Sequence, residues 1–257
     1  MSREGARAPS RSVARSPLAA IVGYTVRACV PARRSLLLLP LAGAVLFGLL
    51  ARTASDGSAV DGFVNVAGNA MHSLILPITC LVLGDALLGA EIRSGVFAFT
   101  WLSPVRFRTI VVGRWAGGYA IAVAILVPAV VAGAIVAGAP SAIGPAVVAV
   151  VVGAGAYLGL FLAIGATFRR PVVWSLALVI LVEHLLGAAL TGVAQLSPAW
   201  LAQAALEGLT HPGSEGFREG VPHGWAAVGR LALVAVVGLA IATRRLRHVK
   251  PASPSDG

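Results

Sequence analysis

The sequence predicts an all-α, polytopic membrane protein with six transmembrane helices, an interfacial helix before them and a short cytoplasmic helix between the second and third. Of its 257 residues, 58% are hydrophobic and only 12% are charged, whereas a soluble domain carries about 25% charged residues. The apolar residues form long unbroken runs, which lack the alternation of barrel strands. We therefore expect one membrane-spanning domain over residues 1–250 and a disordered tail over 251–257.

The stretch before the first apolar run, residues 16–34, is moderately apolar and ends in Arg33 and Arg34. This pattern is typical of a helix that lies in the cytoplasmic membrane interface. A targeting peptide is the alternative, because residues 1–34 are rich in Arg and Ser and contain Glu4 as their one acid. The stretch is long for the charged region of a signal peptide, so we favour the interfacial helix.

Six segments can cross a membrane, because each meets or approaches the roughly 20 mostly apolar residues that a crossing needs. The first is slightly short and contains Pro40. The six segments are 35–51, 66–88, 115–138, 143–168, 171–194 and 226–243.

The basic residues predict the orientation of these spans. All of them except Arg52, Arg218 and Arg230 lie before the first span, in the loops after the second and fourth spans, or after the sixth. The positive-inside rule then places both termini in the cytoplasm, and an even number of spans requires the same. Heavy use of Arg, Ala and Gly with a single lysine suggests a GC-rich bacterial genome, so we expect the bacterial plasma membrane.

The net charge of +10 could also indicate nucleic-acid binding. Here the charge lies in short loops between apolar runs and not on a compact soluble domain. We expect membrane lipids, and no nucleic acid, as partners of this surface.

The loop between the fifth and sixth spans contains "SPAWLAQAALEGLT", with Ser197 as an N-cap and Pro198 at the first helical position. Its apolar residues recur near helical spacing. We expect a short amphipathic helix at the outer surface, followed by a Gly/Pro-rich turn over 211–224.

Motifs for catalysis and metal binding are missing from the sequence. A Walker A loop needs a lysine after a glycine-rich turn, and Lys250 follows no such turn. The five histidines are scattered over different segments, and Cys29 and Cys80 lack the clustered spacing of a metal site. We expect no enzyme activity, no catalytic residue, no metal site and no disulfide in this chain.

The segment 89–108, "GAEIRSGVFAFTWLSPVRFR", is too charged to cross a membrane. At helical spacing it has one apolar stripe, formed by Ile92, Val96, Phe99 and Leu102. Phe97 and Trp101 lie on the opposite side, where a free surface helix should be polar. Ser103 and Pro104 end the helix. One apolar face can meet the membrane, and the other calls for a second protein.

This region, "LGDALLGAEIRSGVFAFTWLSPVRFRTIVVGRW", resembles the type-2 (ABC-2) permease subunits of ABC exporters. In that family a Glu-x-Arg-x-Gly element follows the second span, and a short helix, a proline, an arginine cluster and a Gly-Arg or Gly-Lys pair lead into the third. The matching residues are Glu91, Arg93, Gly95, Pro104, Arg106, Gly113 and Arg114. Six spans and an interfacial helix extend the resemblance to most of the chain.

The resemblance implies the permease subunit of an ATP-driven exporter. The segment 89–108 would then contain the coupling helix, with Phe97 and Trp101 docked on a separate ATPase subunit. Two permease chains, identical or paralogous, would form the pathway. The chain would hold no cofactor, and ATP and Mg would bind the partner ATPase. The alternative for this segment is a loop anchored at the lipid headgroups, with its aromatic side chains in the membrane–water interface. The alternative function is a stand-alone secondary transporter or channel.

Glu183 and His184 lie in the middle of the fifth span. A charge at this depth is costly, so such residues usually face the bundle interior or a cavity. One interpretation places Glu183 on the translocation pathway or at a gate. The other is a neutral Glu183 that pairs with His184 or a neighbouring helix.

Asn65, Asn69 and His72 follow i, i+4, i+7 spacing in the second span and should share one face. They could contact a polar substrate, but we favour packing. Gly155 and Gly159 have the spacing of close helix contacts, and we expect them to pack inside the bundle and not at a dimer seam.

Overall fold

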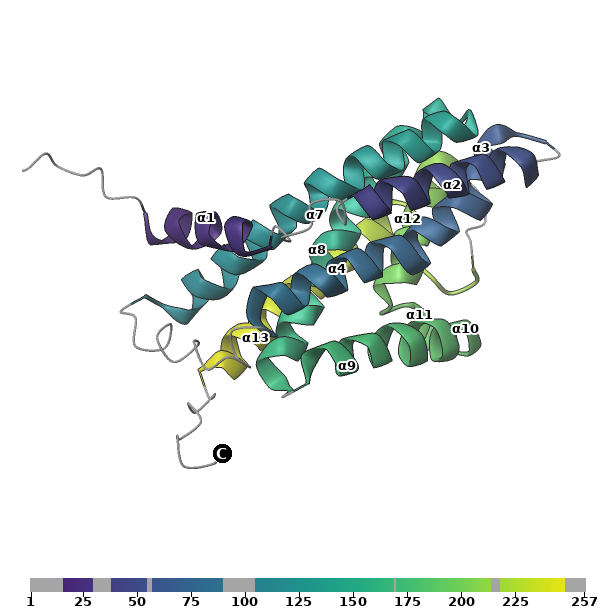
Figure 1. The fold of residues 1–257 in the computed structure, drawn as a ribbon. Helices are drawn as coiled ribbons and strands as arrows, with labels where there is room; N and C mark the ends of the chain where they lie inside the picture. Colours follow the sequence, from purple (N-terminus) through teal and green to yellow (C-terminus); the bar gives the residue numbers. More distant parts are fainter. Residues whose placement is uncertain are drawn as a thin grey trace, which may run out of the picture.

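The computed structural model describes residues 16–29, 38–54, 57–89, 105–168, 170–213 and 218–247. Across these ranges the chain is almost entirely helical and contains no strand, so the predicted all-α class is confirmed there. Figure 1 shows long helices running roughly along one direction, with α1 (Pro17–Cys29) at one end of the bundle.

Five helical segments are long and apolar enough to cross a membrane, and they correspond to the second to sixth predicted spans. They are Ala59–Leu87, Phe107–Ala137, Pro140–Thr167, Pro171–Ala189 and Trp225–Leu246. A multi-pass membrane protein follows from them. The second span begins at Ala59 and not at 66, and the third begins at Phe107 and not at 115, because the helices continue through polar residues that a search for apolar runs excludes.

The predicted first span, 35–51, corresponds to α2 (Leu39–Ala54), which has 16 residues. At 1.5 Å per residue such a helix is about 24 Å long, shorter than the roughly 30 Å hydrocarbon core. It packs closely on α7 (Phe107–Ala137), because a Cβ atom on Gly48 would lie 2.5 Å from the carbonyl oxygen of Gly133.

Two of the spans contain π-helical turns, in which the hydrogen bonds run from i to i+5 and each residue turns through a smaller angle. The second span is built from α3 (Ala59–Gly62), η2 (Phe63–Gly68), η3 (Met71–Ile75), α4 (Leu76–Gly84) and η4 (Asp85–Gly89). The fifth is built from α9 (Pro171–Ala177), η6 (Leu178–Leu186) and α10 (Gly187–Ala189). A helical wheel drawn with 3.6 residues per turn therefore becomes inaccurate along both spans.

The helix α8 (Ile143–Thr167), which follows the short η5 (Pro140–Ala142), is enclosed by its neighbours. A Cβ on Gly155 would meet Trp115 of α7, and a Cβ on Gly159 would meet the backbone of Ala235 in α13 (Trp225–Leu246). The prediction that these two glycines pack inside the bundle is confirmed.

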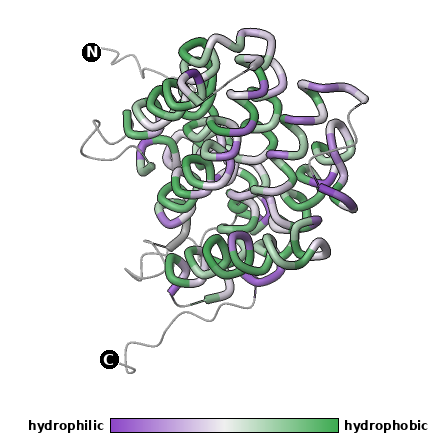
Figure 2. Tube along the Cα trace, turned by 90° about the vertical axis from the view of Figure 1, so that its right-hand side faces the viewer, coloured by the Kyte–Doolittle hydropathy of each residue, from purple (hydrophilic) through white to green (hydrophobic). Residues whose placement is uncertain are grey.

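Large apolar side chains also cover the outside of the bundle. Val173, Leu181 and Leu233 are among many that are more than half exposed. Figure 2 shows hydrophobic residues predominating along most of the helical tubes. A soluble protein seldom exposes such an area, whereas lipid tails accept it.

The helix α12 (Pro198–Thr210), which follows α11 (Thr191–Ala194), corrects the predicted surface helix. It packs within the bundle against α8 and α13, and Leu201 and Leu206 are fully buried. Its alanines at 202, 204 and 205 are buried too. Small side chains on several sides let neighbouring helices enclose it, which the recurrence of apolar residues alone did not reveal.

Two glycines of α13 provide a test of this packing. A Cβ on Gly238 would lie 2.5 Å from the backbone of Gly159, whereas a Cβ on Gly229 would meet open space. We expect Gly238→Ala to lower the free energy of unfolding by about 1–3 kcal/mol through overpacking. Gly229→Ala should raise it by about 0.5–1 kcal/mol, because alanine favours the helix. Thermal unfolding of both variants in detergent measures the difference, and equal effects would contradict the α8–α13 contact.

Candidate functional site

Glu183 is buried in η6, with 1% of its surface exposed. The hydroxyl of Tyr157, from α8, donates a hydrogen bond of 2.5 Å to its Oε2. The indole Nε1 of Trp200, from α12, donates to its backbone carbonyl at 3.1 Å. Glu183 is thus held by α8, which precedes η6 in the sequence, and by α12, which follows it.

The carboxyl group of Glu183 also faces the first turn of α12, where Ser197 and Ala199 lie beside it. The N-terminal end of a helix carries a partial positive charge, so this arrangement favours a carboxylate. The Ser197 hydroxyl and the Ala199 backbone N–H lie within hydrogen-bonding reach of it.

Gln203, one turn further along α12, has 3% of its surface exposed. Its Nε2 donates to the carbonyl of Val64 at 3.0 Å, which fixes the amide across to η2. Its side chain also lies within hydrogen-bonding reach of the buried ring of His72. The amide therefore joins α12 to both η2 and η3.

His184 does not pair with Glu183, although the two are adjacent in sequence. Its side chain is exposed, and its Nε2 lies 3.1 Å from the carbonyl oxygen of Ser73. Of the two partners considered for a neutral Glu183, the neighbouring helix provides one, through Tyr157.

A cavity of about 60 Å³ lies between the second span, η6 and α12. Its lining is formed by Asn69, Ser73, Glu183, His184, Ala199, Trp200 and Gln203. Glu183 and Gln203 are the buried polar members, whereas Asn69 and His184 are exposed. The structure thus brings both predicted pathway residues, Glu183 and His184, to one cavity.

We expected Asn65, Asn69 and His72 to share one face of the second span, but they do not. Asn65 and Asn69 are exposed, and Asn69 lines the cavity. His72 is buried, with its Nδ1 2.7 Å from the carbonyl oxygen of Gly68, so it packs as we favoured. The π-helical turns of η2 and η3 shift His72 away from the two asparagines, because 3.6-residue spacing does not hold there.

Sequence analysis did not single out Tyr157, Trp200 or Gln203 for this site. Tyr157 was visible as one phenol among the small apolar residues of "GAGAYLG", and a buried phenol needs a partner. Gln203 was the one amide within an alanine-rich helix. No spacing rule connects either residue to Glu183, because they come from different helices.

The residues predicted to couple to an ATPase fall mostly outside the described ranges. These are Glu91, Arg93, Gly95, Phe97, Trp101 and Pro104. Arg106 is described, and it lies exposed just before α7. The ends that flank the segment are joined, because Nη1 of Arg114 donates to the carbonyl of Leu87 at 2.5 Å.

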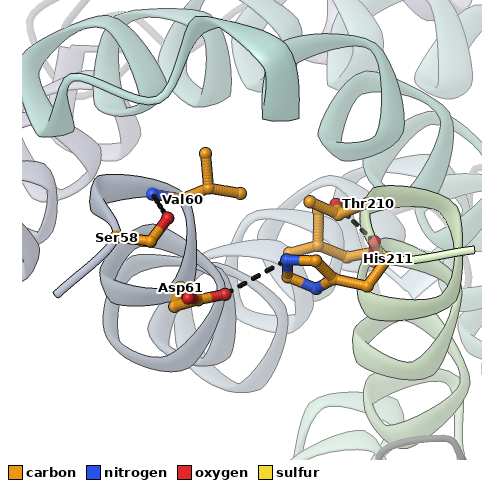
Figure 3. Close-up of polar contacts among 6 residues, drawn as sticks. Ser58, Val60, Asp61, Thr210 and His211 are labelled. Atoms are coloured by element: carbon orange, nitrogen blue, oxygen red, sulfur yellow. Dashed lines mark hydrogen bonds and ion pairs between the residues drawn. The ribbon is translucent and has the colours of Figure 1, made fainter. Parts of the chain in front are cut away.

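A second polar group lies at the other end of α12. His211 and Asp61 approach to 3.1 Å, with 38% and 56% of their side chains exposed, and Figure 3 shows Asp61 beside Ser58 and Val60 at the start of α3. An exposed pair of this kind contributes at most about 1 kcal/mol. The pair matters for the arrangement of the helices, because it joins the end of α12 to the start of the second span.

Within the described residues, no group of three or more His, Cys, Asp or Glu could hold a metal ion. Cys29 and Cys80 are buried, and they are not joined in a disulfide. The chemistry that the described site offers is therefore that of one carboxyl group and its hydrogen-bonding neighbours.

The bond between Tyr157 and Glu183 can be tested by a double-mutant cycle. Tyr157→Phe leaves a buried carboxyl group without its donor and should lower the free energy of unfolding by about 1–3 kcal/mol. Glu183→Leu should also destabilise, since it strands the phenol. The double variant should lose less than the sum, because it removes both polar partners. Tyr119→Phe, at the half-buried tyrosine of α7, is the control, and additive losses would argue against the bond.

Glu207, in the last turns of α12 and outside the five candidate spans, should make stability depend on pH. Burial raises the pKa of its carboxyl group, against the opposing influence of His211 and His223. A group with a raised pKa in the folded state stabilises fully below its ordinary pKa, near pH 4, and this contribution is lost as the pH rises through the raised value. The substitution Glu207→Gln should therefore raise the melting temperature more at pH 7 than at pH 4, compared with the unaltered chain at the same pH. Glu219→Gln, at an exposed acid nearby, should leave that difference unchanged.

No protein-family model and no curated protein matches this chain.

Proposed function

We propose that this chain is the permease subunit of an ATP-driven exporter of the ABC-2 type. In this proposal α2, with the residues before it, completes a set of six spans in a bacterial plasma membrane. The helix α1 lies in the cytoplasmic interface, and both termini are cytoplasmic. Two such chains would enclose the pathway, and a separate ATPase would bind and hydrolyse ATP with Mg.

The observation that carries the proposal is the clamp between Leu87 and Arg114. It closes the two ends of the segment that contains Phe97 and Trp101, with the Arg114 guanidinium buried. Leu87 also packs where a Cβ on Gly118 would lie, at 2.8 Å. A force applied to the segment would therefore act on the second and third spans together.

The helix α1 supports the same interpretation. Ile21 and Thr25 occupy the space that a Cβ on Gly113 or Gly117 would need, each at 2.8 Å. Gly113 belongs to the Gly-Arg pair of the family resemblance. In this chain the pair has a physical use, because the glycine admits α1 and the arginine ties α7 to the second span.

Docking through Phe97 and Trp101 can be tested by co-purification with the ATPase that this proposal requires, and an ABC ATPase gene adjacent to the gene of this chain would be the first to try. Phe97→Asp combined with Trp101→Asp should abolish co-purification of the tagged ATPase, because two charges cannot replace an apolar docking face. The control is Phe97→Leu with Trp101→Phe, which keeps the face apolar and should keep the complex. A complex that survives the double aspartate variant would reject the docking segment.

The polar groups around Glu183 favour a second candidate, a secondary transporter that works without an ATPase. More buried polar side chains meet there than the sequence indicated, including Tyr157, His72 and Gln203. Proteoliposomes separate the two functions. Transport driven by a proton gradient in the absence of the ATPase would favour the second candidate, and transport that requires ATP and the ATPase would favour the first.

A further inference from the structure

We propose that one rim of the bundle binds an anionic phospholipid, with the lipid phosphate on arginines and the acyl chains along the fifth span. We call this surface the arginine rim, and it consists of Phe168, Arg170, Trp174, Arg245 and Arg247. The inference goes beyond the proposed function, because lipid binding at this rim requires neither an ATPase nor transport.

The turn between α8 and α9 brings exposed aromatic rings to the two sides of Arg170. This arginine stands just before α9 in a non-helical conformation, with φ −120° and ψ 71°, and its side chain is exposed. The rings of Phe168 and Trp174 stack with their centroids 4.8 Å apart, and the two residues are 39% and 51% exposed. Aromatic rings favour the headgroup level of a bilayer, so the stacked pair places Arg170 at that level.

The last turn of α13 adds two more arginines at the same end of the bundle. The helices α8 and α13 pack together, with Gly159 against Ala235, and Figure 1 shows α13 ending at the end of the bundle where α9 begins. Counting forward from that contact brings the end of α8 level with Arg245. Leu246 is buried, whereas Arg245 and Arg247 are exposed. Both arginines therefore lie on the surface at the level of the aromatic pair.

Positive charge exceeds negative charge at the arginine rim. Asp85 is the one described acid at this end of the bundle, and it lies half-buried between η4, α8 and α9. No ion pair joins Arg170, Arg245 or Arg247 to a described residue. A guanidinium group matches the oxygens of a phosphate, and each basic residue near the membrane surface adds to the attraction for anionic lipids. The charge of the rim therefore selects an anionic headgroup over a zwitterionic one.

Exposed apolar side chains continue from the rim along the fifth span. Val173, Leu176 and Ile180 are all exposed, so acyl chains can lie along them while the phosphate rests on the arginines. A soluble phosphate compound would leave this apolar face uncovered. A second copy of the chain placed symmetrically on this face would bring two arginine rims together, and like charges oppose that contact. A lipid is thus the occupant that matches both parts of the surface.

Quenching of Trp174 fluorescence by brominated lipid tests this inference. The chain is reconstituted in phosphatidylcholine bilayers with a small fraction of brominated phosphatidylglycerol or of brominated phosphatidylcholine, since bromine quenches the tryptophans that it contacts. The same measurement on Trp174→Phe isolates the signal of this residue from that of the other tryptophans. The local fraction of anionic lipid at Trp174 should exceed its bulk fraction at least about fivefold. Added salt should reduce the excess, because exposed charges are screened.

Charge variants at exposed positions separate the rim from a general attraction to the protein. Arg170→Gln combined with Arg245→Gln and Arg247→Gln should remove the excess of anionic lipid. Lysine at the same three positions should keep most of it, because the charge is kept. Arg230→Gln is the matched control, since this exposed arginine of α13 lies towards the opposite end of the helix, and it should leave the excess unchanged.

Equal quenching by the two brominated lipids, or an excess that survives the triple glutamine variant, would overturn the lipid site. Quenching by neither lipid would also overturn it, because a protein surface such as a second copy of the chain would then cover Trp174. Should the triple glutamine variant fail to fold, the comparison of the two lipids and its salt dependence still decide the question. Loss of ATPase docking in the separate co-purification test leaves these outcomes unaffected.

Discussion

The close approach of α8 to its neighbours is the constraint on which the rest of the bundle depends. Helices in a bilayer gain little by hiding apolar side chains from lipid, so they associate where small residues let their backbones meet. On α8 three glycines make room for three different neighbours. Gly153 faces the side chain of Leu76 in α4, Gly155 faces the ring of Trp115 in α7, and Gly159 meets the backbone of Ala235 in α13. With α8 enclosed on these sides, its phenol at Tyr157 has to find its partner inside the protein.

That requirement explains why polar side chains gather where α8, η6 and α12 meet. Tyr157 takes Glu183 as its acceptor, and the donors of Trp200 and Gln203 reach the carbonyls of Glu183 and Val64. Both carbonyls belong to π-helical stretches, where the wider turns alter the regular ladder and where functional sites are often found. The π-helical stretches, which change the residue spacing along the faces of these two spans, thus also accept the hydrogen bonds donated by side chains of α12.

The apolar runs predicted the last five spans, because length and hydropathy are local properties of the sequence. The polar site was predicted only at Glu183 and His184, and their adjacency was misleading, since one is buried and the other exposed. Tyr157 and Gln203 join Glu183 through contacts between helices, which no local pattern encodes. The burial of α12 escaped prediction for the same reason. Its alanines fit a surface helix and an enclosed helix equally well until the neighbouring glycines, such as Gly68 against Leu206, are known.

The second span links the two regions that the proposed function requires. At one end Leu87 is tied to Arg114, beside the segment proposed to meet the ATPase. Nearer its other end Asn69 and Ser73 line the cavity. The π-helical η2 and η3 lie between Asp61, which is held by His211, and the regular α4. Under the proposed function, a displacement of the clamped end would travel along α4 and reach the cavity wall at these wider turns. The opposite wall, formed by Ala199 and Gln203 of the enclosed α12, would stay in place, so the cavity would change shape without rearrangement of the bundle core.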